Sequence, residues 1–400
     1  MWLSQLALAS FRNLASLRLE CEPGVLLFCG RNGQGKTNLL ESVYVLATSR
    51  SPRTSSEREL ISWRTQSDPD LAAVVAPFAR IEGRVRRAEG EVHLEVTFEA
   101  DRPGAEREGS SPVARTIKVN GLPARATSLV GQLAVVYFSP GDVALAGGPP
   151  AGRRQYLNLA GSQASANHLR ALQRYNRVVL QRNQVLRLVR ERRQPPSALE
   201  PWTEQMLDWG SLILRQRLQM LHGLDELADG IFRDLAGTDE TMHVCYRSSA
   251  LDSVGPVSLD QIRDGFREAQ ERVATREIDQ AVSLVGPHRD DFTFVLDDVD
   301  LNTYGSRGQQ RLAVLALKLA EADWMRAEVG ELPVVLLDDV LSELDPHRRG
   351  YVLQRLAVDI DTAPRQRQVW ITTTEANGFS ADLLAAAQQY NIDAGSVRRA

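Results

Sequence analysis

Two unbroken apolar runs predict strands that are buried on both faces and that end in polar loops. The first run spans residues 25–29, and the second spans 333–337 and is closed by Asp338 and Asp339. Runs of this kind are typical of parallel strands in α/β proteins. Residues 38–46, which follow the first run and its loop, have apolar positions at helical spacing. The pattern therefore predicts an α/β fold with a strand, loop and helix in succession.

The middle of the chain shows two other patterns. Residues 80–100 and 116–138 alternate between apolar and polar positions, which predicts antiparallel strands with a hairpin turn within 119–122. Residues 101–114 are rich in Gly, Pro, Glu and Arg and predict a loop insertion. Three further segments have apolar residues at three- and four-residue spacing and predict helices: 168–193, 202–227 and 259–277.

The first predicted helix has an apolar seam and a dense arginine face. Arg182 interrupts the seam, which consists of Leu172, Tyr175, Val179, Leu186 and Val189. Glu191 is the only acidic residue of the segment, so the arginine face is a candidate for binding the DNA backbone. The residues predicted to bind DNA are Arg170, Arg174, Arg177 and Arg182. A solvated face, paired with acids of neighbouring helices, is the alternative.

A second basic patch is also a candidate for binding DNA, with the same alternative. It consists of Arg50, Arg53, Arg84, Arg86 and Arg87.

The loop after the first strand matches the G-x-x-x-x-G-K-[ST] phosphate-loop motif at every fixed position. Its glycines let backbone N–H groups turn toward an anion at the start of the following helix. Lys36 is expected to reach the β and γ phosphates of ATP, and the Thr37 hydroxyl is expected to ligate Mg²⁺. The predicted nucleotide-binding residues are Gly30, Arg31, Asn32, Gly33, Gln34, Gly35, Lys36, Thr37 and Asn38. A glycine-rich turn with a chance lysine is the alternative.

The two carboxylates after the second apolar run complete the predicted catalytic set. Asp338 is expected to hold Mg²⁺, directly or through water, together with Thr37. Asp339 is expected to orient or deprotonate the water that attacks the γ phosphate. With Lys36, these carboxylates are the predicted catalytic residues.

Composition limits where such a protein acts. The chain has 400 residues, of which 43% are hydrophobic and 24% charged, which is ordinary for a globular protein. No apolar run approaches the ~20 residues of a membrane span, and residues 1–5 lack the features of a signal peptide. Three dispersed cysteines provide no disulfide framework. We therefore expect a cytoplasmic protein with no membrane partner, and the net charge of −4 requires that any DNA binding be local.

A signature segment precedes the second apolar run. Residues 304–311 read Y-G-S-R-G-Q-Q-R, and S-E-L-D follows the two carboxylates. Together with the phosphate loop, these segments resemble the ATP-binding-cassette heads of the SMC-like DNA repair ATPases. The resemblance implies that Ser306, with Gly308 and Gln309, contacts ATP bound to a partner subunit. It also implies an ATP-dependent homodimer that encloses two ATP molecules.

Two further segments narrow the resemblance to the RecF family. Residues 142–158 contain G-G-P-P-A-G-R-R-Q-Y-L-N, and residues 286–291 read G-P-H-R-D-D. The resemblance implies an ABC-type ATPase head with a phosphate-loop core sheet, an antiparallel β part and a helical second lobe. The expected segments are 1–160 and 281–400 for the head and 161–280 for the helical lobe. His288 is better explained by a structured loop than by a metal site.

The resemblance to RecF also implies a function. A DNA-stimulated, slow ATPase would clamp duplex and gapped or single-stranded DNA. With a RecR-type mediator it would help to load recombinase on gaps covered by single-strand-binding protein. The alternatives are an SMC-type chromosome organiser, which the short helices disfavour, and a transporter nucleotide-binding subunit.

Three departures from ABC proteins accompany this resemblance. Asp339 replaces the usual glutamate, no Q-loop glutamine follows 135–138, and threonines at 372–374 replace the switch histidine. The missing histidine disfavours the transporter, and the shorter carboxylate of Asp339 makes slow hydrolysis the expectation.

Overall fold

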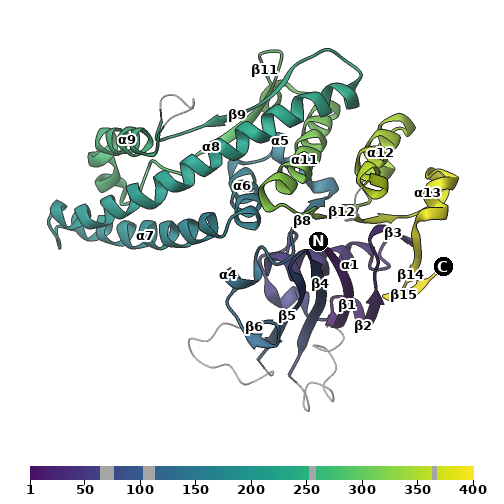
Figure 1. Cartoon of the computed structure of the whole chain (residues 1–400). Coiled ribbons are helices and arrows are strands. Elements are labelled where there is room, and N and C mark those ends of the chain that lie inside the picture. Colours follow the sequence, from purple (N-terminus) through teal and green to yellow (C-terminus); the bar gives the residue numbers. More distant parts are fainter. Residues whose placement is uncertain (64–75, 102–112, 252–257, 363–366) are drawn as a thin grey trace. The chain divides into compact units, whose positions relative to one another are not determined.

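The computed structural model describes residues 1–63, 76–101, 113–251, 258–362 and 367–400, which form two compact units (Figure 1). Unit 1 comprises Met1–Gly141 and Met325–Ala400, and unit 2 comprises Asp142–Trp324. The chain therefore leaves unit 1 once and returns to it. The predicted helical lobe, 161–280, lies entirely within unit 2, which also contains 142–160 and 281–324. The boundaries after residues 160 and 280 stay predictions.

Unit 1 contains a six-stranded sheet in which only β15 is antiparallel to its neighbour. The strand order is β15-β14-β3-β13-β12-β8. The strands are β3 (Gly24–Cys29), β8 (Val135–Phe138), β12 (Val334–Asp338), β13 (Gln368–Thr373), β14 (Gln388–Asp393) and β15 (Ser396–Arg399). Every residue of β12 is buried, as are the first five of β3, which confirms both strands predicted from unbroken apolar runs.

A second six-stranded sheet of unit 1 is antiparallel, with the order β2-β1-β4-β5-β6-β7. Its strands are β1 (Trp2–Phe11), β2 (Leu14–Glu20), β4 (Phe78–Arg87), β5 (Gly90–Ala100), β6 (Val113–Val119) and β7 (Leu122–Pro123). Asn120 and Gly121 form the predicted turn, and both have positive φ angles, 52° and 77°. These angles suit a two-residue hairpin loop.

Helix α1 (Lys36–Thr48) contacts strands of both sheets. All but two of its 13 residues are buried, because a helix between two sheets has no solvent face. Other helical elements described in unit 1 are η1 (Glu57–Leu60), α4 (Ala126–Leu129), η4 (Val340–Glu343), α12 (Pro346–Thr362), η5 (Ala376–Gly378) and α13 (Ala381–Ala386).

One prediction for the β-rich part is wrong, and another lies mostly outside the described residues. Residues 135–138 form β8 in the parallel sheet, so their assignment to the antiparallel part is wrong. All four of their side chains are buried, whereas buried and exposed side chains alternate along strands of the antiparallel sheet such as β4. Of the predicted loop insertion at 101–114, residues 102–112 lie outside the described residues, and Val113 and Ala114 belong to β6.

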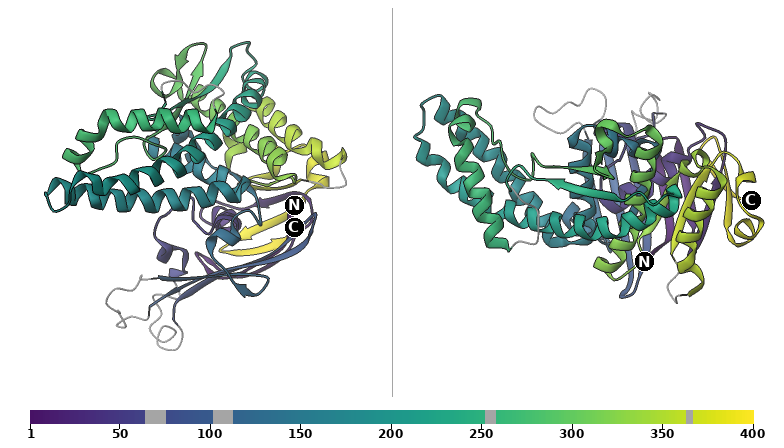
Figure 2. Two further views of the ribbon diagram at one scale, coloured as in Figure 1. Left: turned by 60° about the vertical axis from the view of Figure 1, so that its left-hand side comes forward. Right: turned by 90° about the horizontal axis from the view of Figure 1, so that it is seen from above.

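Unit 2 consists mainly of helices and a small sheet with the order β11-β10-β9. The strands are β9 (Met242–Arg247), β10 (Asp291–Leu296) and β11 (Val299–Asp300), and the short helical turns are α5 (Ala144–Gly147), η3 (Pro196–Leu199) and α10 (Leu301–Tyr304). The longer helices are α6 (Pro150–Ala164), α7 (Ala166–Arg190), α8 (Glu200–Ala236), α9 (Leu259–Gln280) and most of α11 (Arg307–Val329). The helices α7, α8 and α9 confirm the three predicted helices. Figure 2 shows them side by side. The turn η2 (Pro140–Val143) spans the boundary between the units.

Arg182 lies in the buried seam of α7 rather than on its arginine face. Its side chain is 1% exposed, and its guanidinium lies 2.6 Å from the Glu277 carboxylate of α9. It also donates hydrogen bonds to the hydroxyls of Thr203 and Ser283. The prediction that Arg182 binds DNA is therefore wrong, because the residue completes the packing of α7, α8 and α9 as a buried ion pair.

We expect Arg182→Met to lower the free energy of unfolding by about 3–5 kcal/mol, because it leaves the Glu277 carboxylate buried without its partner. Chemical denaturation followed by circular dichroism measures this change. Arg187→Met on the exposed face is the matched control and should stay within about 0.5 kcal/mol of the unaltered chain. Equal losses in the two variants would contradict a stabilising pair at Arg182.

Candidate nucleotide-binding site

The phosphate loop connects the end of β3 to the start of α1. The Gly30 N–H donates to the Thr373 carbonyl of β13 at 3.2 Å, which ties the loop to the neighbouring strand. Gly33 and Gly35 have φ angles of 81° and 116°, a region that favours glycine. The Lys36 ammonium, in a side chain that is nearly buried, donates to the carbonyls of Gly30 (2.7 Å) and Arg31 (3.2 Å). The loop therefore holds a positive charge at its centre, which fits an anionic ligand.

Asp338 gathers three hydroxyl groups from three elements at the end of β12. Its carboxylate accepts hydrogen bonds from Thr37 of α1 (3.0 Å), Tyr137 of β8 (2.9 Å) and Thr372 of β13 (2.9 Å). The structure thus brings together Thr37 and Asp338, the two predicted Mg²⁺ ligands. Sequence reasoning did not find Tyr137 or Thr372 as partners of Asp338. Their position near the carboxyl ends of apolar strands is the sequence signal that could have identified them.

Asp339 follows in a left-handed backbone conformation, with φ of 55°. Its N–H donates to Thr372 Oγ1 at 3.0 Å, which orients the residue after the strand. Its Oδ1 is buried and accepts no hydrogen bond from the described residues. A buried carboxylate oxygen without a donor is costly, so this atom fits an acceptor for a water molecule.

The Thr37 hydroxyl and the Asp338 carboxylate would supply only part of the coordination shell of Mg²⁺. A hydroxyl and a carboxylate are ligands that Mg²⁺ prefers, and it usually takes the remaining ligands from water and substrate phosphates. No group of three or more His, Cys, Asp or Glu residues that could hold a metal occurs among the described residues. The site therefore fits a metal that arrives with a nucleotide.

A buried carboxylate holds the segments behind the phosphate loop. Glu41 of α1 is 0% exposed and accepts two hydrogen bonds from Arg12, at 3.0 and 2.7 Å. It also accepts from Ser51 (2.6 Å) and Arg53 (3.3 Å). Arg53 in turn donates to the Asn38 side chain at 2.8 Å. Arg12 and Arg53 therefore support α1 through its Glu41 carboxylate.

The signature segment lies at the start of α11 in unit 2. The Ser306 hydroxyl accepts from the Gln309 N–H (3.2 Å), and the Gln309 side chain accepts from the Ser306 N–H (3.0 Å). This reciprocal pair is a capping box, which satisfies two N–H groups at the helix start. Ser306 and Gly308 are both exposed. The segment is therefore rigid and accessible.

The two segments that narrow the resemblance to RecF meet within unit 2. Arg153 of the first donates two hydrogen bonds to Asp291 of the second, at 2.6 and 2.8 Å. Asp290 is buried and accepts hydrogen bonds from Tyr246 (2.7 Å) and Ser249 (2.6 Å). These contacts connect residues that lie far apart in the sequence.

His288 lies inside this loop as a neutral ring. Its Nδ1 hydrogen-bonds to Tyr175 of α7 at 2.7 Å, and its Nε2 hydrogen-bonds to the Ser283 carbonyl at 3.1 Å. Burial, followed by the positive charge of Arg289, lowers the pKa of His288 from 6.5 to about 4. These bonds fit the structured loop that the sequence favoured over a metal site.

The remaining predicted arginines differ in their surroundings. Arg170, Arg174 and Arg177 are exposed on α7, and none of them forms an ion pair within the described part of the chain. In the second basic patch, Arg84 and Arg86 pair with Glu91 and Arg87 pairs with Glu331. The stripe on α7 therefore offers more unneutralised charge.

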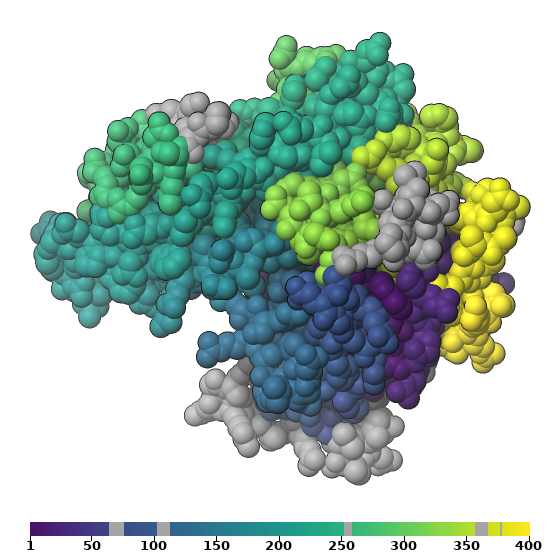
Figure 3. Space-filling model, viewed as in Figure 1, coloured from purple at the N-terminus to yellow at the C-terminus, as the bar shows by residue number. Residues whose placement is uncertain are grey.

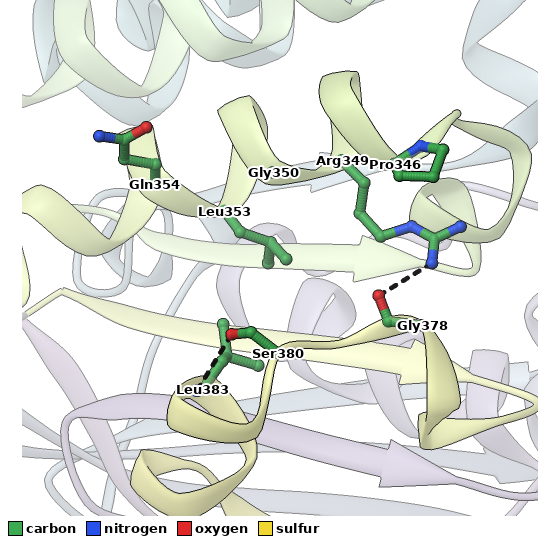
Figure 4. A pocket seen from close by; sticks show the side chains of 8 residues that line it. All are labelled: Pro346, Arg349, Gly350, Leu353, Gln354, Gly378, Ser380 and Leu383. Carbon is green, nitrogen blue, oxygen red and sulfur yellow. Dashed lines mark hydrogen bonds between the residues drawn. The ribbon is translucent and has the colours of Figure 1, made fainter.

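Unit 1 also has a cavity of about 360 Å³ between α12 and α13, shown in Figure 4. Its lining residues are Pro346, Arg349, Gly350, Leu353, Gln354, Gly378, Ser380 and Leu383. The Arg349 guanidinium donates to the carbonyls of Leu341, Leu344 and Gly378. None of the predicted nucleotide-binding residues lines this cavity, so it is separate from the phosphate loop.

Similarity to known proteins covers nearly the whole chain. The family model described as the RecF/RecN/SMC N terminal domain matches residues 2–391. The DNA replication and repair protein RecF of Roseiflexus castenholzii is 39% identical over 401 residues, which is 99% of each chain. The protein of the same name from Halalkalibacterium halodurans is 34% identical over 400 residues, all of each chain. This chain belongs to the RecF family.

Solved structures agree with this membership of the RecF family. Structures described as the recombination mediator protein RecF with ATP and with ATPrS, in the RecFOR pathway, are 30% and 29% identical. Each has a TM-score of 0.84 and covers 100% of this chain, which covers 97% and 98% of theirs. An Smc head domain from Pyrococcus furiosus, 13% identical with a TM-score of 0.54, shares the fold alone. The predicted α/β ATPase-head fold is confirmed.

No helix among the described residues is both long and apolar enough to cross a bilayer.

We expect unit 2 to lose stability as the pH falls from about 6.5 to 4. Burial also lowers the pKa of His168 to about 4, so His168 and His288 stay neutral in the folded chain while they protonate near 6.5 when unfolded. The unfolded chain then binds more protons, and each histidine costs about 2 kcal/mol at pH 5 relative to pH 7.5. Denaturation at the two pH values measures this.

His288→Gln should remove about half of this histidine contribution, since it deletes one of the two buried rings. The matched control is His222→Gln, whose side chain is 76% exposed. A pH dependence that is the same in the His288 variant and the control would contradict the buried neutral ring.

Proposed function

We propose that this chain is a RecF-type ATPase that binds ATP with Mg²⁺ and acts on DNA during recombination and repair. The observation that carries the proposal is the contact between Thr37 and Asp338, at 3.0 Å, which joins the start of α1, directly after the phosphate loop, to the end of β12, 301 residues away in the sequence. The full-length RecF relative solved with ATP supports the same nucleotide for this chain.

The loop residues bind the nucleotide in this proposal. The N–H groups of residues 31–37 surround the phosphates, and the Lys36 ammonium moves from the carbonyls that it contacts now to the β and γ oxygens. Thr37 and Asp338 hold Mg²⁺, and Asn38 follows on the first turn of α1. The metal neutralises charge that develops on the phosphate oxygens.

Asp339 performs the proton chemistry of hydrolysis. Its unpartnered Oδ1 accepts a hydrogen bond from the attacking water and then the proton, and the bond between its N–H and Thr372 keeps the carboxylate in place. The carboxylate is one methylene shorter than the glutamate of other ABC proteins. A longer distance from this carboxylate to the water fits slow turnover.

Ser306, Gly308 and Gln309 complete the site of a second subunit. Ser306 and Gly308 are exposed and Gln309 is half-buried at the N-terminus of α11, a position that suits contact with the γ phosphate of ATP on a partner, where the helix dipole adds favourable potential. ATP would then assemble a homodimer with two shared sites.

The exposed stripe of Arg170, Arg174 and Arg177 binds the phosphates of DNA without reading bases. Gapped DNA offers both duplex and single-stranded phosphates to such a stripe. With a RecR-type mediator, the DNA-bound dimer helps to load recombinase on gaps covered by single-strand-binding protein. The RecF relative solved with ATP is described as a recombination mediator, which supports this role.

Two variants should separate ATP binding from dimerisation. Lys36→Ala should abolish both, because it removes the positive charge that contacts the β and γ phosphates. Ser306→Arg should keep ATP binding by the monomer but prevent the ATP-dependent dimer, because a bulky side chain enters the interface. Isothermal titration calorimetry and light scattering measure the two properties. ATP binding by Lys36→Ala with near-normal affinity would refute the proposed site.

Replacement of Arg170, Arg174 and Arg177 by Gln should weaken binding of unrelated DNA sequences to a similar extent. Each lost phosphate contact should reduce the slope of log K against log salt concentration by about 0.9 on duplex DNA. Fluorescence anisotropy at several salt concentrations measures the slope. Arg84→Gln with Arg86→Gln is the control, since Glu91 already neutralises this pair in part. A slope that falls only in the control would move the DNA site to the second patch.

A further inference from the structure

The phosphate loop is held from behind by two hairpins that supply none of the predicted nucleotide-binding residues. One is the turn between β1 and β2, which contains Asn13, and the other is the turn between β14 and β15, which contains Ala394 and Gly395. The segment that contains α13, β14 and β15 forms the yellow surface of unit 1 in Figure 3. Both turns converge on Gln34, at the middle of the loop.

Gln34 is held by three hydrogen bonds. Its carbonyl accepts from the Asn13 side chain at 3.0 Å and from the Gly395 N–H at 2.9 Å. Its side-chain oxygen accepts from the Ala394 N–H at 2.6 Å. A peptide plane whose carbonyl is held on one side presents the N–H of the next residue, Gly35, in a fixed direction.

Close packing at glycines leaves this arrangement little freedom. A Cβ atom on Gly35, which has a φ of 116°, would lie 2.8 Å from the Asn13 side chain. A Cβ atom on Gly395, which has a φ of 82°, would lie 2.2 Å from the Asn13 carbonyl oxygen. The loop, Asn13 and the β14–β15 turn therefore fit together only with glycine at both positions.

The side chain of Asn13 is fully engaged within the protein. Its amide donates to Gln34, and its oxygen accepts from Asn38 of α1 at 2.8 Å. Asn13 therefore acts on the loop from behind and leaves the phosphates to the loop itself.

We propose that Asn13 and the β14–β15 turn form a clamp that holds the phosphate loop in its binding conformation. Asn13 is a positioning residue, and the hairpin at 388–399 contributes to ATP affinity although it supplies no proposed ligand of the nucleotide. The inference rests on the proposed ATP binding. It extends that binding to residues outside the motif, because an N–H array that is ordered before binding costs less to assemble around a ligand.

Isothermal titration with ATP and Mg²⁺ tests the clamp. Asn13→Leu has a similar shape but can form neither hydrogen bond, so Kd for ATP should rise about 5- to 10-fold. Asn167→Leu on α7, an exposed asparagine that makes none of the clamp contacts, is the matched control and should leave Kd within about 2-fold. Peptide-resolved hydrogen exchange of the nucleotide-free protein should accelerate in residues 30–38 for Asn13→Leu alone. A role limited to general stability would accelerate exchange throughout unit 1.

Gly395→Ala tests the β14–β15 turn, the second half of the clamp, and leaves the sequence of Asn13 and of the phosphate loop unchanged. It should also raise Kd for ATP, because the added methyl group would push the turn away from Asn13. Gly121→Ala is the matched control, since Gly121 has a similar φ of 77° in a similar turn but nothing within 4 Å of its Cβ position.

The outcomes separate the clamp from the proposed function. ATP affinity within about 2-fold of the unaltered chain in both Asn13→Leu and Gly395→Ala, with folding confirmed by circular dichroism, would overturn the clamp. Absence of ATP binding by the unaltered chain would instead overturn the proposed function, and the clamp with it.

Discussion

Parallel pairing of β3, β13 and β12 is the constraint on which the candidate site depends. The register places Phe28, Thr372 and Asp338 in one row across the three strands, so the strands end together. Because these carboxyl ends meet at one edge, Thr37 after the phosphate loop and the Asp338 carboxylate at the end of β12 lie within hydrogen-bond distance. The apolar residues of β12, all buried, stabilise this row from both faces of the sheet. The chemistry of the site therefore follows from sheet topology.

Buried polar groups in unit 2 have a related role. Arg182 with Glu277 connects α7 to α9, and Asp290 with Tyr246 connects the loop before β10 to β9. Such groups are costly to bury, and each is tolerated because several donors and acceptors meet it with short hydrogen bonds. Each of these pairs joins two elements that lie far apart in the sequence. The G-P-H-R-D-D segment thus has a structural task within unit 2, alongside the pairing of Asp291 with Arg153.

Residues outside the eight-residue phosphate-loop motif hold both the loop and the helix that follows it. Lys36, Thr37 and the glycines are the proposed nucleotide contacts, while Glu41, Arg12 and Arg53 hold the helix that follows. Asn13 and the β14–β15 turn hold the loop from the other side. A loop built for an anion contains backbone groups that repel one another without the ligand, so support from neighbouring hairpins keeps it ordered.

The sequence by itself determined the elements whose signals are local. Unbroken apolar runs marked β3 and β12, helical spacing marked α7, α8 and α9, and glycine spacing marked the phosphate loop. Tertiary structure decided what depends on distant partners. Arg182 is one of several arginines along α7 until Glu277, about 95 residues away, turns it into a buried ion pair. Likewise, the partners of Tyr137, Thr372 and Asn13 are not set locally, because only sheet register and hairpin packing place these residues against Asp338 and Gln34.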